Sequence, residues 1–190
     1  MKKIGLFILT AAFVFSLSAS DVSAAGLVLN GSGVRTKFLV GTLYTLSLYV
    51  SDQLKGKSGK EVIESNDAMY FVMQLESNLI TRERFVESTG EGFGKSAASG
   101  YATAKKQAFL DQFNKTVFNK GDIIIMSYTP AGLTTTYKKV ETGKDGKPAY
   151  MAVNLGTIAG LDLKKALFAI WLGPDPIQDS LKNALLGVKK

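Results

Sequence analysis

The chain has 190 residues, of which 46% are hydrophobic, and a net charge of +7. That length suits one globular domain with a sizeable core. Cysteine and histidine are both absent, which excludes disulfides, a zinc site of the usual ligands and a nucleophile–histidine pair, so we expect no metal and no cofactor. The lysines are scattered, and we therefore expect a solvated surface that can attract anionic lipids or acidic ligands, and no nucleic-acid partner.

The first 24 residues predict an export signal. Two lysines precede an apolar stretch that ends near Leu17, and the small-residue pattern Val22-Ser23-Ala24 follows. The apolar stretch is short for a membrane span, which needs about 20 residues, so we prefer cleavage near Ala24 to an uncleaved anchor. We expect a signal peptide over 1–24, a domain over 25–190, a periplasmic or secreted location, and no stable membrane anchor after cleavage.

The first part of the domain sequence predicts strands. Stretches rich in Leu, Val, Thr and Tyr indicate strands at 27–38 and 40–50, and an apolar run indicates a buried strand at 69–75. A polar stretch with a short helix near 60–64 separates the second strand from the third.

Two central helices follow. Thr81 is a good N-cap, and behind it Phe85, Thr89 and Phe93 recur every four residues on one face. A second helix is expected from Tyr101 to Phe113, with an apolar side of its own.

A strand meander and closing helices complete the chain. Strands are expected at 123–128, 133–139 and 149–155, with turns that contain glycine between them. A helix is expected at 163–171, and a last helix with Asp175 as its cap and Pro176 at its first position. This order predicts an α+β fold in which a largely antiparallel sheet is covered on one face by helices.

The stretch from Gly31 to Arg35 carries the most chemical information. Its two glycines permit close backbone approach within a strand, and Arg35 follows two residues later. If Arg35 points inward it needs an anion, and a ligand carboxylate fits its planar fork. The alternative is an arginine that is exposed or paired with Glu76 or Glu87.

Gly31-Ser-Gly-Val-Arg35 resembles the glycine–x–glycine–x–arginine signature that opens the chalcone isomerase fold, and 167–187 is similar to the closing helix–loop–helix of that family. The resemblance spans nearly the whole domain and implies the chalcone isomerase-like fold. The family includes plant enzymes that cyclise chalcones to flavanones, non-catalytic relatives that bind fatty acids, and secreted bacterial members.

The resemblance also implies roles for single positions. In the enzymes the arginine holds a substrate oxygen, and by position Arg35 matches it. The enzymes' threonine falls at or near Tyr44, their tyrosine at Phe85, their lysine near Ser88 and their asparagine near Gly92. These departures remove polar groups that would position a water and polarise a ketone. A phenol beside Arg35, in contrast, suits a carboxylate, and this is the pairing implied for the fatty-acid-binding relatives.

We therefore expect a non-catalytic binder of a small apolar acid, with no catalytic residues. The predicted ligand-binding residues are Arg35, Tyr44, Phe85, Ser88 and Tyr101. Two alternatives stay open, an isomerase of chalcone-like substrates and an envelope protein that binds a partner. The sequence leaves the oligomeric state undetermined.

Overall fold

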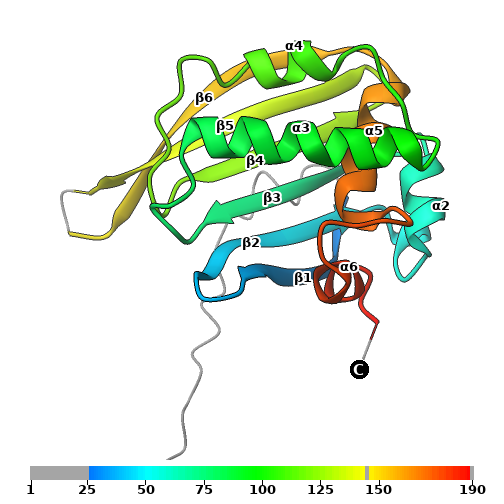
Figure 1. The fold of residues 1–190 in the computed structure, drawn as a ribbon, viewed down its shortest axis with the longest axis horizontal. Coiled ribbons are helices and arrows are strands. Elements are labelled where there is room, and N and C mark those ends of the chain that lie inside the picture. Colours follow the sequence, from blue (N-terminus) through cyan, green and yellow to red (C-terminus); the bar gives the residue numbers. More distant parts are fainter. Residues whose placement is uncertain (1–25, 144–145, 189–190) are drawn as a thin grey trace, which may run out of the picture.

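One antiparallel sheet organises the protein (Figure 1). The computed structural model describes residues 26–143 and 146–188. Within these ranges six strands form the sheet, and their order in space follows their order in the sequence. The strands are β1 (Val28–Lys37), β2 (Gly41–Val50), β3 (Met69–Leu75), β4 (Ile123–Thr129), β5 (Gly132–Thr142) and β6 (Pro148–Ile158). All predicted strands are confirmed close to their expected bounds.

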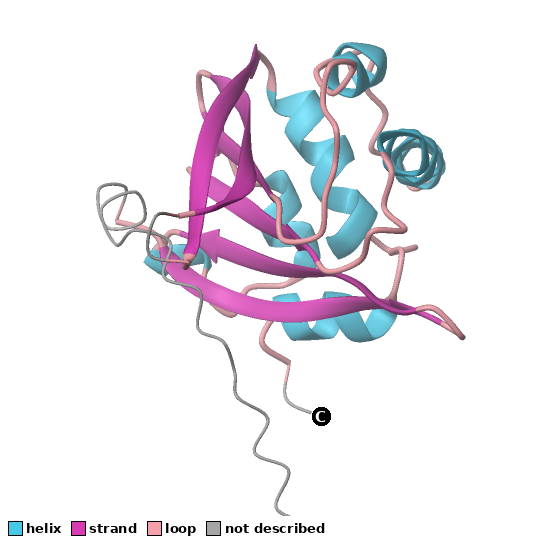
Figure 2. Cartoon of the chain, turned by 90° about the vertical axis from the view of Figure 1, so that its left-hand side faces the viewer, coloured by secondary structure: helices cyan, strands magenta, loops and turns pink. Residues whose placement is uncertain are grey.

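The helices α3, α4 and α5 lie on one side of this sheet (Figure 2). The helical segments are η1 (Asp52–Leu54), α2 (Gly59–Glu64), α3 (Arg82–Ala98), α4 (Lys106–Asp111), α5 (Leu161–Leu172) and α6 (Asp179–Leu185). Helix α5 is buried along nearly its whole length because it packs between α3 and the sheet, where Phe168 and Trp171 contact Phe71. The predicted α+β fold is confirmed.

The main core lies between the sheet and these helices. Alternate residues of β2 point toward the helices, so Tyr44, Leu46, Leu48 and Val50 are buried. The opposite face of the sheet carries a smaller apolar cluster centred on Tyr70, Val72 and Ile123. Strand β3 contributes to both clusters, which explains why it is buried almost throughout.

The predicted helix from Tyr101 to Phe113 is wrong in its first half. Gly100 has φ +92°, a conformation that favours glycine and ends the preceding helix. The Gly100 N–H bonds to Ala97 O at 3.0 Å and the Tyr101 N–H to Ser96 O at 2.8 Å, the two bonds of a Schellman cap. Tyr101 therefore lies in the turn after α3, and α4 begins only at Lys106.

The predicted start of the last helix is also wrong. Asp175 and Pro176 precede α6, and Gln178 takes the N-cap position instead. The carboxylate of Asp175 pairs with Lys95 of α3 at 3.2 Å and so caps no helix. The segment before α6 is thus held by side-chain contacts to α3 and, as shown below, to β1.

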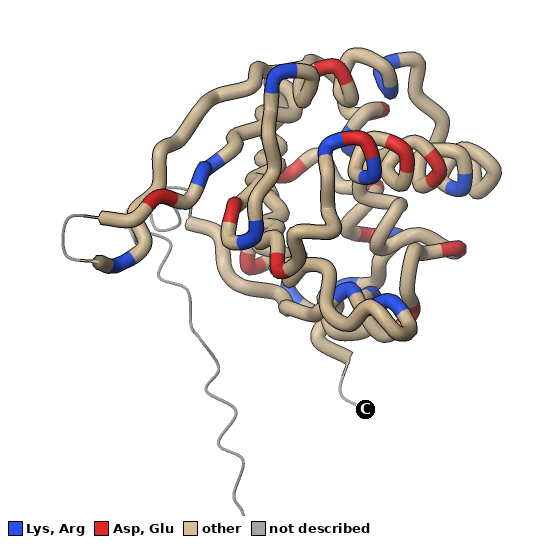
Figure 3. The backbone as a smooth tube through the Cα atoms, turned by 60° about the vertical axis from the view of Figure 1, so that its left-hand side comes forward, with Lys and Arg blue, Asp and Glu red and all other residues tan. Residues whose placement is uncertain are grey.

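The expected signal peptide lies outside the described residues, and its cleavage stays a prediction. In the part of the chain that the structure describes, no helix has both the length and the apolar composition that a membrane crossing requires. Basic and acidic residues are spread over helices and strands alike (Figure 3), in keeping with the scattered charges of the sequence.

Candidate functional site

The two glycines of the Gly31–Arg35 motif let helix α6 lie directly on β1. A Cβ atom at Gly31 would stand 2.1 Å from Ala184 O, and one at Gly33 would stand 2.7 Å from the Cβ atom of Ala184. Any larger residue would therefore push α6 off the strand. The glycines and Arg35 share the helix-facing side of β1, since their cross-strand partners are the buried residues of β2. The close contact thus brings the N-terminal end of α6 to Arg35.

Arg35 is half-buried and contacts only neutral oxygens in the described part of the chain. Its Nη1 donates to Thr36 O at 2.9 Å and to Gln178 Oε1 at 2.9 Å. Neither Glu76 nor Glu87 pairs with it; Glu76 accepts instead from Thr45 Oγ1 at 3.4 Å. The positive charge of Arg35 is therefore uncompensated by any described carboxylate.

Gln178 joins β1 to the start of α6. Its Oε1 accepts from the Thr36 N–H at 3.0 Å in addition to Arg35, and its Nε2 donates to Val34 O at 3.2 Å and to Ser180 Oγ at 2.6 Å. The side chain is thus committed to the strand, which explains why it makes no capping bond to its own helix. The amide oxygen of Gln178 thus accepts hydrogen bonds from Arg35 Nη1 and the Thr36 N–H, two donors that also suit a carboxylate oxygen.

Tyr44 is the direct cross-strand neighbour of Arg35 and is buried. Its hydroxyl oxygen accepts a bond from Trp171 Nε1 at 3.0 Å. Burial raises the pKa of Tyr44 to about 12, against smaller opposing effects of the Trp171 bond and the Arg35 charge. The phenol therefore keeps its proton, for which the described residues supply no acceptor, and that proton is free for a ligand.

The other three predicted ligand contacts do not gather around Arg35 and Tyr44. Phe85 packs in an aromatic cluster, with its ring 4.8 Å from Phe113 and 5.2 Å from Phe118. Ser88 donates to Phe85 O of its own helix at 3.3 Å. Tyr101, in the turn after α3, bonds through its side chain to Glu64. Their part in ligand binding stays a prediction.

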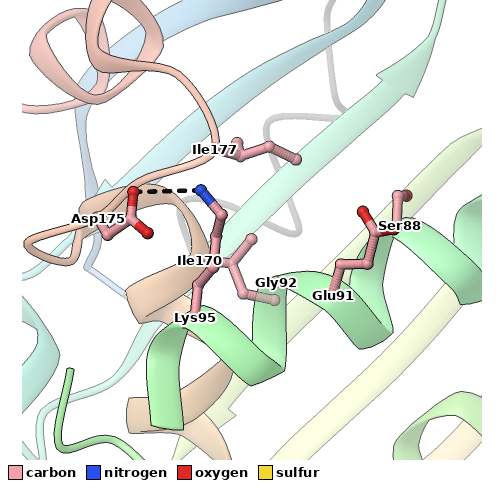
Figure 4. Close-up of a pocket in the computed structure, with 7 residues that line it drawn as sticks. All are labelled: Ser88, Glu91, Gly92, Lys95, Ile170, Asp175 and Ile177. Atoms are coloured by element: carbon pink, nitrogen blue, oxygen red, sulfur yellow. Dashed lines mark hydrogen bonds and ion pairs between the residues drawn. The ribbon is translucent and has the colours of Figure 1, made fainter. Parts of the chain in front are cut away.

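A small hollow lies between α3 and the segment that leads into α6 (Figure 4). It is lined by Ser88, Glu91, Gly92, Lys95, Ile170, Asp175 and Ile177, and its volume is about 50 Å³. Sites for small molecules typically measure roughly 300–1,000 Å³. The Lys95–Asp175 ion pair spans one side of the hollow, and neither Arg35 nor Tyr44 lines it. In this conformation the hollow is too small for a fatty acid.

The departure at Gly92 has a packing cause. A Cβ atom on Gly92 would stand 2.8 Å from Ile170 Cγ2 of α5, so the two helices cross here at a distance that only glycine allows. The position to which the resemblance assigns an asparagine is thus filled by the neighbouring helix. The positions to which the resemblance assigns a tyrosine, a lysine and an asparagine thus carry Phe85, Ser88 and Gly92, while Lys95 of the same helix lines the hollow and pairs with Asp175.

Elsewhere in residues 26–143 and 146–188, two charged side chains are buried, and both have hydrogen-bond partners. Lys164 of α5 donates to Val62 O, Ile63 O and Ser65 O at 2.7, 2.9 and 2.8 Å, which satisfies carbonyls at the C-terminal end of α2. Burial, helped by the charge of Lys165, lowers the pKa of Lys164 to about 7.

The second is Asp122, which precedes β4. Its carboxylate accepts from the N–H groups of Asn119 and Val140 at 2.7 and 2.8 Å and from the Tyr137 hydroxyl. Burial and then the bond to Asp122 raise the pKa of Tyr137. Lys164 and Asp122 each hold elements of the fold together, and neither bonds to Arg35.

Sequence reasoning missed Gln178 and Trp171. Trp171 is the single tryptophan of the chain, and an indole N–H inside an apolar helix needs a buried acceptor, which was an available signal. Gln178 gave a weaker signal, since Asp175 and Pro176 formed a better helix start in the sequence.

The comparisons with known proteins agree with this geometry. The sequence pattern described as chalcone isomerase-like matches residues 16–187, and the chain belongs to this family. Among solved structures, the fatty-acid binding protein of Arabidopsis thaliana shares the fold, with a TM-score of 0.57 and 16% sequence identity over 85% of this chain and 87% of that one. No curated protein sequence matches the chain.

Proposed function

We propose that this protein binds a fatty acid or another small apolar carboxylate without catalysis, and that Arg35 and Tyr44 hold the carboxylate. The observation that carries the proposal is the guanidinium of Arg35, which is half-buried beside a buried phenol and bonds only to neutral oxygens of the described chain. A carboxylate supplies the missing charge through the planar fork of the guanidinium.

Gln178 marks the place of the carboxylate. Its Oε1 already accepts from Arg35 Nη1 and from the Thr36 N–H. A ligand carboxylate that displaces this amide accepts hydrogen bonds from both donors and replaces a neutral acceptor by a charged one. It can also accept a hydrogen bond from the Tyr44 hydroxyl. Because the neighbouring hollow is too small for an acyl chain, binding requires the segment 173–178 to move away from α3.

The family supports a binder. The chain shares its fold with a protein described as fatty-acid binding. We extend that binding role to this chain as part of the proposal. The face of α3 where the resemblance implies catalytic polar groups carries Phe85, Ser88 and Gly92 instead. We place the protein in the periplasm or outside the cell, on the strength of the predicted signal peptide.

Native mass spectrometry of protein purified from its own host tests the proposal, together with thermal unfolding in the presence of saturated fatty acids. We expect co-purified acyl species, and stabilisation by about 2.7 kcal/mol when the ligand concentration is 100 times Kd. Arg35→Ala should abolish this stabilisation while the protein stays folded, and Arg84→Ala, which removes an exposed guanidinium on α3, should preserve it. No bound acid and no stabilisation by any chain length would refute the proposal.

A direct assay separates the binder from an isomerase. Ring closure of a chalcone in the presence of the protein should be no faster than in buffer. A rate that exceeds the buffer rate and falls in Arg35→Ala would instead establish catalysis at the same anchor.

A further inference from the structure

The turn between β1 and β2 exposes three consecutive apolar side chains. Phe38 is 88% exposed, Leu39 91% and Val40 40%. Single exposed apolar residues are ordinary in soluble proteins, but a contiguous group at the end of a hairpin marks an interaction site. The turn joins the strands that carry Arg35 and Tyr44, and it lies at the lower left of the ribbon in Figure 1.

The backbone of this turn favours the same interpretation. Leu39 has φ +62°, and it is the only residue other than glycine with a positive φ in the described chain. Asparagine and glycine adopt a positive φ at a lower conformational energy than leucine, and neither would expose an apolar side chain to solvent. The turn thus carries a bulky apolar residue where both strain and exposure disfavour it.

Two more exposed apolar residues lie at the same end of the sheet. Leu79, in the loop after β3, is 49% exposed, and Val117, in the loop before β4, is 75% exposed. The antiparallel register sets the end of β3 and the start of β4 beside the start of β2. The Lys120 N–H donates to Asn78 Oδ1 at 3.1 Å and ties these two loops together. We call the segments 37–41, 76–81 and 115–121 the loop end.

Basic side chains accompany the apolar ones at the loop end. Lys37, Arg84 at the start of α3, Lys115 and Lys120 are exposed, and none has a carboxylate partner among the described residues. Of the acidic side chains nearby, Glu83 pairs with Arg82 and Glu76 is half-buried against Thr45. The loop end therefore combines exposed apolar residues with three exposed lysines, and the one carboxylate within its three segments is that of Glu76.

We propose that the loop end docks reversibly on an anionic lipid bilayer, with Phe38 and Leu39 inserted at the level of the headgroups. Apolar side chains that enter the interface while lysine and arginine contact acidic headgroups are the two components of peripheral membrane binding. A second copy of the chain fits less well, since it would bring the same positive loops into contact. Docking is independent of the proposed ligand, although it would set Arg35 close to the membrane surface.

Vesicle co-sedimentation tests the docking. The probes are vesicles of phosphatidylcholine with about one third phosphatidylglycerol, and vesicles of phosphatidylcholine alone. Both the full chain and a chain that begins at Ala25 are used, because every described strand and helix lies between Val28 and Leu185. We expect binding of both chains to the anionic vesicles, and binding that weakens as salt is added.

Matched variants locate the contact. Phe38→Ser with Leu39→Ser should lower vesicle affinity at least about tenfold. Leu29→Ser, at the end of β1 that is remote from the turn, should have little effect. Lys115→Gln with Lys120→Gln should reduce affinity and its salt dependence, and Lys55→Gln with Lys60→Gln should reduce them less.

The proposal is overturned if the chain that begins at Ala25 does not bind anionic vesicles, or if both pairs of variants bind like their controls. It is also overturned if Phe38→Ser with Leu39→Ser changes only the oligomeric state. A fatty-acid titration of Phe38→Ser with Leu39→Ser keeps the two proposals apart, since its ligand affinity in solution should equal that of the unaltered protein.

Discussion

Arg35 and Lys164 are both cations withdrawn from solvent in the same domain, Arg35 partly and Lys164 fully, yet their surroundings differ. Lys164 is fully buried and its ammonium donates to three carbonyls, one for each proton. Arg35 has five donors, and the described chain engages it through one nitrogen with two neutral oxygens. The fold supplies an acceptor for each N–H group of Lys164, whereas Nε and Nη2 of Arg35 have no described hydrogen-bond acceptor. That difference is the basis on which we propose Arg35 as the ligand anchor.

The largest expected effect is the loss of Lys164. Lys164→Met leaves three carbonyls without a donor, and each unsatisfied buried group costs about 1–3 kcal/mol. We expect the free energy of unfolding, measured with urea, to fall by about 3 kcal/mol or more. Lys165→Met, which removes only the ion pair with Glu64 at the surface, should cost less than about 1 kcal/mol. Equal effects would contradict a structural role for Lys164.

A methyl group on the glycine motif comes next. Gly31→Ala sets a Cβ atom 2.1 Å from Ala184 O, and we expect a loss of about 1–3 kcal/mol in the free energy of unfolding as α6 is displaced from β1. Gly90→Ala meets no atom within 4 Å in helix α3 and should stabilise the protein by up to about 1 kcal/mol. If Gly31→Ala were neutral, the close contact of α6 would not position Arg35.

The pH dependence of stability follows from Lys164. Its pKa in the folded state, about 7, lies below the value of about 10.4 in the unfolded chain. The folded state therefore binds fewer protons between these values, and the free energy of unfolding should rise with pH by roughly 1–3 kcal/mol from pH 7 to 10. Lys164→Met should lack this rise. Above pH 10 the free energy of unfolding should fall again. With its raised pKa, folded Tyr44 keeps its proton, whereas the tyrosine of the unfolded chain releases it.

The smallest effect concerns Gln178, and its sign is the informative part. Gln178→Ala removes the amide that bonds to Arg35 Nη1 and the Thr36 N–H, so the ligand-free protein should lose about 1 kcal/mol of stability. Because the amide competes with the ligand carboxylate, fatty-acid affinity should rise severalfold in calorimetry. The comparison variant Ser180→Ala loses one partner of the same amide and should leave affinity unchanged. A drop in affinity for Gln178→Ala would mean that Gln178 orients Arg35 for the ligand.

The sequence predicted the sheet well because the strands carry their own periodicity and the turns their own glycines. It failed at Tyr101 because helix termination by Gly100 depends on backbone bonds that the apolar pattern does not show. It failed at Asp175 because a long-range ion pair with Lys95 removed the expected cap. Arg35 and Tyr44 were predicted through the resemblance to the family motif, and the structure places them opposite each other on β1 and β2. Gln178 was not, since its contacts with β1 span more than 140 residues.

The central claim is that a carboxylate replaces the Gln178 amide at Arg35. A crystal structure of the protein with palmitate tests it most directly. We predict the carboxylate within about 3 Å of the Arg35 guanidinium, the Tyr44 hydroxyl turned toward it, and the Gln178 side chain displaced. A palmitate bound elsewhere, with the Arg35–Gln178 bond intact, would contradict the account.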